Sequence, residues 1–171
     1  MDFLSENNIE MHKSYLNGLM LNYNIFEKSY PELVSLDIAG IYKTRIKYSE
    51  KEKAAALLSE IIAHKIYFSS FSRQNLVSER ITKEFGSIAE FLYEISEACS
   101  KVKTGFLLIY DLHGRVGLYC GDEYQKVLGE KNVILALDLC EHAYFYDYGF
   151  ERKKYVMNAI SHFDLNKLQN V

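Results

Sequence analysis

The spacing of apolar residues changes once along this chain, near residue 104, and that change constrains the fold more than any other feature. Over 9–23 and 54–68, apolar side chains recur every three or four residues, which is typical of amphipathic helices. Beyond residue 104, short runs rich in β-branched and aromatic residues predict strands over 105–111, 116–120 and 133–139. Long helices followed by a few strands are the pattern of an α+β fold.

Helix start signals divide the chain further. Ser5 is a good N-cap for the first long helix, and Ser49 with Glu52 three residues later is a capping-box pattern for the second. Further helices are expected over 32–41, 78–84, 87–101 and 150–162. A polar connector near residues 73–75 then marks a boundary between an N-terminal helical part, 1–75, and the remainder, 76–171.

Charge and hydropathy exclude several classes of protein. Lys and Arg total 20 against 23 Asp and Glu, a net charge of −3 with no basic block, so we expect no binding to nucleic acid. The apolar stretches are too short to span a bilayer, so we expect no membrane partner. The acidic, polar N-terminus is unlike a secretory signal, which predicts a cytoplasmic protein.

The cysteines and the absence of several known motifs narrow the classes of protein to which the chain could belong. Cys99, Cys120 and Cys140 are odd in number and form no CxxC pair, so we expect buried thiols and no disulfide framework. The sequence contains no Walker loop, GxGxxG, GxSxG, HExxH or EF-hand pattern. These absences argue against a phosphate-cradling protein and against a serine hydrolase.

Three of the five histidines lie where a metal site could form. His12 and His64 each lie on the apolar face of a long predicted helix, and His142 follows Asp138 by four residues at the end of a predicted strand. Three imidazoles and one carboxylate suit iron, manganese or zinc. The alternative, drawn from the residues alone, is that these are isolated core histidines bonded to carbonyl groups.

Residues 138–148, DLCEHAYFYDY, resemble the signature D-x-W-E-H-A-Y-Y-x-D-Y of the iron/manganese superoxide dismutase family, with Cys140 in place of its tryptophan. Other segments resemble the family in the same order: IEMH at 9–12, AHKIY at 63–67, FGS at 85–87, TGFLLI at 104–109 and RKKY at 152–155. Together they cover nearly the whole chain.

The resemblance implies a fold, a site and an activity. The fold is an N-terminal helical hairpin over 1–75 and a C-terminal α/β metal-binding part with a three-stranded antiparallel sheet over 76–171. The implied ligands of one iron or manganese ion per subunit, iron slightly preferred, are His12, His64, Asp138 and His142. The residues implied around these ligands are Glu60, Tyr67, Glu141, Tyr144 and Arg152. The implied reaction is the disproportionation of superoxide to oxygen and hydrogen peroxide, in a homodimer bridged partly by the segment 141–144.

The sequence departs from the family around the ligands. Leu16 and Asn17 stand where the family has a His-His pair, and Met20 stands where it has a tyrosine at the substrate funnel. Glu60 takes the place of a glutamine that, in the iron form, bonds the metal-bound solvent. Glu60 could instead be an ordinary solvated residue of the helix surface.

Three functions therefore stay open at this stage. The first is a working, slow dismutase, and the second is a metal-binding protein on the same scaffold with little or no such activity, in sensing or another small-molecule redox role. The third is an interaction module without catalysis. Retention of all four ligand positions favours the first two, and the departures at Leu16, Asn17, Met20 and Glu60 predict that metal binding is preserved better than dismutation.

Overall fold

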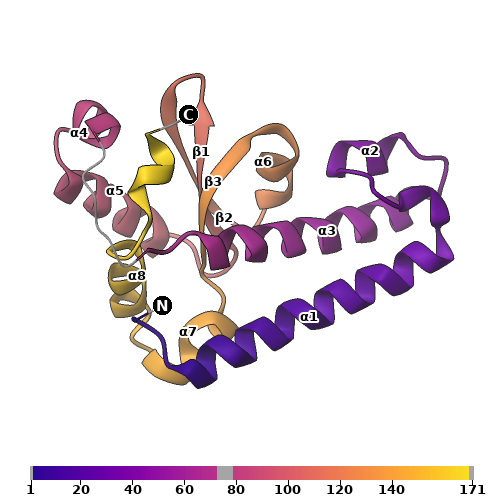
Figure 1. Ribbon diagram of the computed structural model, residues 1–171, viewed down its shortest axis with the longest axis horizontal. Coiled ribbons are helices and arrows are strands. Elements are labelled where there is room, and N and C mark those ends of the chain that lie inside the picture. Colours follow the sequence, from indigo (N-terminus) through magenta and orange to yellow (C-terminus); the bar gives the residue numbers. More distant parts are fainter. Residues whose placement is uncertain (1, 73–78, 170–171) are drawn as a thin grey trace.

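The first part of the chain is a hairpin of two long helices, seen in a computed structural model that describes residues 2–72 and 79–169. Helix α1 (Glu6–Ser29) and helix α3 (Tyr48–Ser69) run antiparallel along one side of the molecule (Figure 1). A short 3-10 turn, η1 (Pro31–Leu33), and helix α2 (Ile38–Lys43) connect them at the far end. The predicted N-terminal helical part is therefore confirmed.

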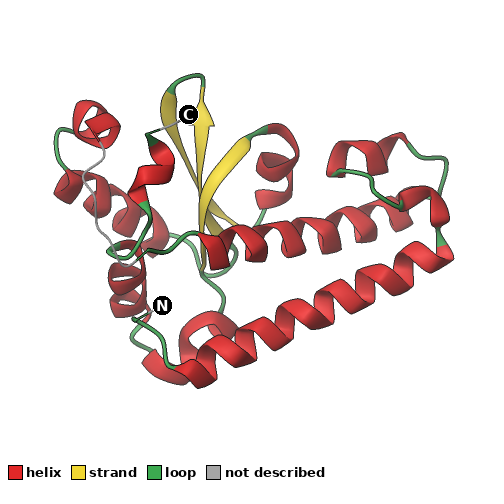
Figure 2. Cartoon of the chain, in the orientation of Figure 1, coloured by secondary structure: helices red, strands yellow, loops and turns green. Residues whose placement is uncertain are grey.

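The second part places helices around a small sheet, as Figure 2 shows. Its strands are β1 (Phe106–Leu112), β2 (Arg115–Gly121) and β3 (Asn132–Asp138). Its helices are α4 (Glu79–Phe85), α5 (Ile88–Ser100), α6 (Tyr124–Glu130), α7 (Glu141–Tyr148), α8 (Arg152–Ile160) and the 3-10 turn η2 (Leu165–Leu168). The strand order is β2-β1-β3 with both pairings antiparallel. The predicted fold class, α+β with a three-stranded antiparallel sheet, is confirmed.

Local sequence signals explain several of these boundaries. The Ser5 hydroxyl accepts a hydrogen bond from the Asn8 amide at 3.2 Å, so the predicted N-cap of α1 is confirmed. The β1–β2 turn holds His113 and Gly114 at φ 51° and 81°. Two successive left-handed residues suit the twist of a two-residue hairpin, and glycine reaches that conformation without strain.

Some expectations from the sequence were wrong. The capping box at Ser49 does not form, because α3 begins one residue earlier with Lys47 as its N-cap. The helix expected over 32–41 is broken into η1 and α2. Helices α6 and α7 were not expected; α6 is short and has no fully buried residue, and its apolar stripe is limited to Tyr124, Val127 and Leu128. The expected boundary between residues 75 and 76 lies outside the described residues and stays a prediction.

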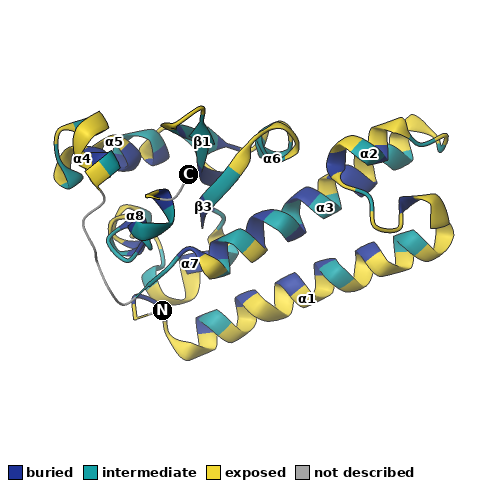
Figure 3. Cartoon of the chain, turned by 45° about the horizontal axis from the view of Figure 1, so that its top comes forward, coloured by how far each residue is buried: buried dark blue, intermediate teal, exposed yellow. Residues whose placement is uncertain are grey.

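Two hydrophobic clusters form the core. The larger joins the sheet with α5, α8 and the N-terminal residues Phe3 and Leu4. The smaller lies within the hairpin, where α1 and α3 pack against α2 through residues such as Leu19, Ile41 and Ala55. Figure 3 shows that α1 buries only its inner face and leaves its outer face to solvent. Among the described residues, no helix is both long and apolar enough to cross a membrane.

A buried serine fastens the hairpin to the edge of the sheet. Ser70 follows α3, and its hydroxyl donates to the Ile66 carbonyl at 2.7 Å while accepting from the Ala136 amide of β3 at 2.8 Å. The Ser70 carbonyl accepts from the Asp164 amide at 2.8 Å. Because β3 is an edge strand, this side chain satisfies a buried amide that no fourth strand pairs.

Candidate metal centre

Four side chains meet where the hairpin contacts the second part of the chain. His12 comes from α1, His64 from α3, Asp138 from the last position of β3 and His142 from the first turn of α7. The side chains of His12, His64 and Asp138 are fully buried, and that of His142 is 31% exposed. Along α1 and α3, His12 and His64 each stand between residues of the larger hydrophobic cluster and residues of the smaller one. The centre therefore lies at the boundary between the two clusters.

The ligand-type atoms of these residues converge on the Asp138 carboxylate. Asp138 Oδ2 lies 3.2 Å from Nε2 of His12, 3.3 Å from Nε2 of His64 and 2.8 Å from Nε2 of His142. One such atom from each residue lies within 4.8 Å of all the others. Atoms bound at about 2.0–2.2 Å from a common ion lie at most about 4.4 Å apart, so this cluster is close to the size that an ion requires.

Hydrogen bonds around the cluster orient its members. His64 Nδ1 lies 2.7 Å from the Glu60 carbonyl, which fixes the proton on Nδ1 and leaves the Nε2 lone pair facing the cluster. Asp138 Oδ1 accepts from the Cys140 amide at 2.8 Å, and the Tyr155 hydroxyl donates to the Asp138 carbonyl at 2.8 Å. The second carboxylate oxygen is thus free to face the three imidazoles.

The electrostatics of the cluster call for a cation. Burial alone would raise the pKa of Asp138, but its interactions with the three imidazoles hold that pKa well below the usual range. Burial lowers the pKa of His12, whereas the Asp138 carboxylate outweighs burial at His64 and raises its pKa. Within the described residues, Asp138 Oδ2 and both ring nitrogens of His12 are buried without a hydrogen-bond partner. A buried carboxylate oxygen surrounded by imidazole nitrogens whose lone pairs have no hydrogen-bond partner fits an ion such as iron or manganese.

Aromatic rings enclose the buried side of the cluster. The rings of Tyr67 and Phe68 lie 4.8 and 5.0 Å from the ring of His12, and Phe106 lies 5.3 Å from His64. Tyr67 and Phe106 are almost completely buried. Tyr67 was expected near the ligands from the sequence, and the structure places its ring against His12.

Tyr15 covers the more open side of the cluster, and sequence reasoning did not single it out. Its ring stacks on His142 with centroids 4.3 Å apart, and it lies 5.4 Å from the ring of His64. Its hydroxyl donates to Glu60 Oε1 at 2.5 Å. The sequence did contain a signal for this position. Tyr15 follows His12 by three residues in the same helix, so the two side chains are neighbours on its surface. Glu60, expected near the ligands, is thereby tied to the residue that covers them.

The other residues expected around the ligands lie farther out. Tyr144 is buried and stacks on Tyr155 at 4.9 Å, while Glu141 is exposed at the start of α7. Arg152 donates from Nη1 to the Cys99 carbonyl at 2.9 Å, so it joins α8 to α5. None of these contacts includes one of the four clustered side chains.

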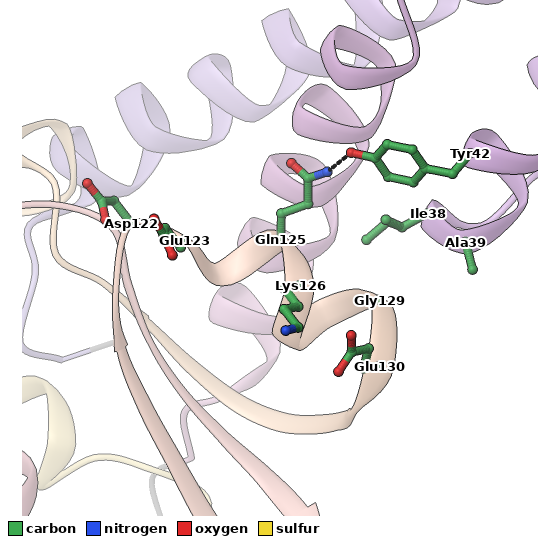
Figure 4. Close-up of a pocket in the computed structure, with 9 residues that line it drawn as sticks. All are labelled: Ile38, Ala39, Tyr42, Asp122, Glu123, Gln125, Lys126, Gly129 and Glu130. Carbon is green, nitrogen blue, oxygen red and sulfur yellow. Dashed lines mark hydrogen bonds between the residues drawn. The ribbon is translucent and has the colours of Figure 1, made fainter. Parts of the chain in front are cut away.

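A separate cleft of about 540 Å³ lies between α2 and α6 (Figure 4). The Gln125 side chain donates to the Tyr42 hydroxyl at 2.7 Å across it, and Lys126 and Glu130 also line it. None of the four clustered side chains lines this cleft. The cleft therefore does not extend the candidate centre.

Comparison of the sequence with known proteins finds similarity to one family of enzymes. The family model for iron/manganese superoxide dismutases, C-terminal domain, matches residues 73–171. The chain is 31% identical over 103 residues to superoxide dismutase [Mn] 1 of Halobacterium salinarum, a match that covers 56% of this chain and 52% of the relative. The chain thus spans about half the length of that relative.

Two further relatives match over most of this chain. The superoxide dismutase [Mn/Fe] of Rickettsia typhi is 26% identical over 162 residues, covering 88% of this chain and 76% of the relative. The superoxide dismutase [Mn] of Acinetobacter baylyi is 26% identical over 171 residues, covering 92% of this chain and 72% of the relative. These matches include the hairpin as well as the sheet.

Proposed function

Because the chain belongs to the iron/manganese superoxide dismutase family, we propose that it is an oxidoreductase that disproportionates superoxide at a single metal ion. Two superoxide anions and two protons would give one molecule of oxygen and one of hydrogen peroxide. The observation that carries this proposal is the convergence of three imidazoles and one carboxylate within 4.8 Å. We assign His12, His64, Asp138 and His142 as the metal ligands.

Each residue of the centre has a task in this proposal. His64 keeps its proton on Nδ1, against the Glu60 carbonyl, so that Nε2 binds as a neutral ligand. Asp138 supplies the negative charge that lowers the net charge of a bound cation. A bound iron or manganese ion would supply a one-electron couple, taking an electron from one superoxide and giving it to the next. Phe68 and Phe106 keep water from the buried side.

Tyr15 and Glu60 restrict approach from the open side. The Tyr15 ring lies flat over His142, and its hydrogen bond to Glu60 holds it there. A small anion can pass beside such a ring more easily than a large molecule can. The Tyr15–Glu60 pair therefore admits a substrate of two atoms more readily than a larger one.

The identity of the ion, the assembly and the location remain predictions. The long hydrogen-bonding side chain of Glu60 favours iron by the family resemblance, and the relatives are named as manganese or manganese/iron enzymes. Glu141 is exposed beside His142, where it can reach a second copy in a homodimer. Light scattering at micromolar concentration tests the dimer, and a monomer would remove it. A cytoplasmic location is expected from the sequence.

The experiment that tests the function separates metal binding from turnover. Protein purified without added metal is analysed for bound elements, and superoxide consumption is then measured per bound ion. We expect about one iron or manganese ion per subunit, and we expect Asp138→Asn to lose most of it. His113→Gln, at an exposed turn histidine, is the matched control and should bind metal like the parent. A parent that holds neither iron nor manganese as purified, and that binds neither when the ions are then added, would refute the proposal.

A second function is favoured by the residues around the ligands. Leu16 is buried and apolar where the family has histidine, and Met20 replaces the funnel tyrosine. A missing proton-relay group lowers a rate by about 10²–10⁴-fold and leaves metal affinity largely intact. A full complement of metal with consumption no faster than that of the free ion would therefore indicate a metal-binding protein without dismutase activity. An interaction module would instead bind no metal.

A further inference from the structure

Two cysteines lie side by side on the face of the sheet that α5 covers. Cys99 is the penultimate residue of α5, and Cys120 is the penultimate residue of β2. Their Sγ atoms are 3.7 Å apart. Cys99 is 1% exposed, whereas Cys120 is only partly buried. The pair is therefore buried at one sulfur and reachable by small molecules at the other.

The separation of the two sulfur atoms is small enough for a covalent bond to form. A disulfide has an S–S length of about 2.0 Å, so the sulfurs need to approach by roughly 1.7 Å. A change of rotamer at one or both cysteines is the movement that would bring the sulfurs together. The third cysteine, Cys140, is engaged elsewhere, since its Sγ lies 3.4 Å from the Gly105 amide nitrogen that donates to it.

The surroundings of the two thiols favour Cys120 as the one that reacts first with an oxidant. Cys99 is then the resolving thiol, which forms the disulfide with the oxidised Cys120. The hydrogen bond with Cys99 lowers the pKa of Cys120, and the Arg152 guanidinium lowers it further. The same hydrogen bond raises the pKa of Cys99, as does its burial. The more accessible sulfur is thus also the one that forms a thiolate more readily, which is the arrangement of a redox-reactive cysteine next to a resolving one.

We propose that Cys99 and Cys120 form a reversible disulfide in response to hydrogen peroxide. The Cys120 thiolate attacks one peroxide oxygen, the O–O bond breaks, and Cys120 sulfenic acid and hydroxide form. The Cys99 sulfur then attacks the Cys120 sulfur, the S–O bond breaks, and water leaves. The departing oxygen carries the Cys99 proton away in that water, and the hydroxide from the first step takes up the proton that Cys120 first lost, so two thiols and one peroxide give one disulfide and two waters. The site does not require the proposed dismutase activity, because peroxide can come from any source.

The bond would connect two elements through a loop of modest length. The chain between Cys99 and Cys120 contains all of β1 and the β1–β2 turn. Closing this loop restricts the unfolded chain, so we expect the oxidised protein to melt at a higher temperature than the reduced protein. Thiol reductants should reverse the difference.

The test counts thiols and maps the bond in the full-length protein. Reduced protein is treated with hydrogen peroxide or, in parallel, with diamide, a two-electron thiol oxidant that does not depend on a bound metal. We expect the titratable thiols of the denatured protein to fall from three to one, with a Cys99–Cys120 peptide found by mass spectrometry and lost on reduction. Because both oxidants are added reagents, the result does not depend on dismutase activity.

Variants identify the order of the two steps. Cys99→Ser should stop disulfide formation and leave a Cys120 sulfenic acid that dimedone traps, whereas Cys120→Ser should give neither product. Cys140→Ser is the matched control and should form the same bond as the parent. Three thiols remaining after diamide, or a disulfide that includes Cys140, would overturn the proposal. If either variant fails to fold, thiol counting and peptide mapping of the parent still decide whether the Cys99–Cys120 bond forms.

Discussion

Ser70 offers a sharp test of how the hairpin is fastened to the sheet. Its hydroxyl donates to the Ile66 carbonyl and accepts from the Ala136 amide, and both Ser70 and Ala136 have no exposed surface. Replacing Ser70 by alanine removes the oxygen and leaves the Ala136 amide in a place that water does not reach. The fold should remain, but its free energy of unfolding should fall.

The size of the effect follows from the two hydrogen bonds. A buried donor left without a partner costs about 1–3 kcal/mol, which dominates the smaller loss of the bond to the Ile66 carbonyl. For a protein of 171 residues, each kcal/mol lowers the melting temperature by about 2–4 °C. We therefore expect Ser70→Ala to melt about 2–12 °C below the parent.

The neighbouring serine is the control for this experiment. Ser69 donates to the same Ile66 carbonyl at 2.9 Å, but it is exposed, so water can replace its hydroxyl. Ser69→Ala should change the free energy of unfolding by no more than about 0.5 kcal/mol. Urea unfolding is measured on metal-free protein throughout, because a bound ion stabilises the folded state. Equal losses in the two variants would show that the bond to Ala136 contributes nothing.

Three further predictions concern the centre and the surface. Tyr15→Ala should release bound metal to a large chelator several-fold faster than the parent, because it removes the ring that covers His142, and Tyr15→Phe should give a smaller increase, because it keeps the ring and loses only the hydrogen bond to Glu60; equal release rates for the parent and Tyr15→Ala would exclude this covering role. Glu60→Gln should raise superoxide consumption per bound metal, since it removes a negative charge near the ion and still accepts from Tyr15; unchanged turnover would place Glu60 outside the working centre. The Arg80 side chain lowers the pKa of Asp111, so this pair stabilises the fold above the ordinary aspartate pKa of 3.8 and loses its effect as the pH falls below it. Urea midpoints between pH 6 and 3 should therefore fall more steeply for the parent than for Asp111→Asn, and parallel curves would contradict the assignment.

The sequence predicted elements with strong local signals and missed those without them. The N-cap at Ser5 and the short strand runs rich in β-branched and aromatic residues are local features, and both were confirmed. The capping box predicted at Ser49 does not form, because α3 begins at Tyr48 with Lys47 as its N-cap. The Lys47 side chain supplies no capping hydrogen bond. Helix α6 has Gly129 in its last turn, and its apolar face consists only of the partly buried Tyr124, Val127 and Leu128, which is too short to indicate a helix by spacing alone. Packing against neighbours decides such cases.

The candidate centre was predictable only in part. Single histidines far apart in the sequence do not indicate that they meet, and family resemblance was needed to bring His12 and His64 to Asp138. The contact between Tyr15 and Glu60 joins residues on two helices, and it depends on how α1 and α3 cross. Neither apolar spacing nor a motif contains that information. The same is true of Cys99 and Cys120, which only the packing of α5 on β2 places together.

The wide separation of the four clustered residues has a consequence for the time at which the protein can acquire an ion. His12 and His142 are about 130 residues apart, so at 5–20 residues per second a ribosome needs roughly 7–26 s between them. Until residue 138 is reached, the nascent chain contains at most two of the four clustered side chains, His12 and later His64, a pair that selects little among the divalent ions of a cell. Under the proposed function, selection of the ion therefore waits until His142 has been added to the chain, and the supply of iron or manganese after that point would decide which ion is bound.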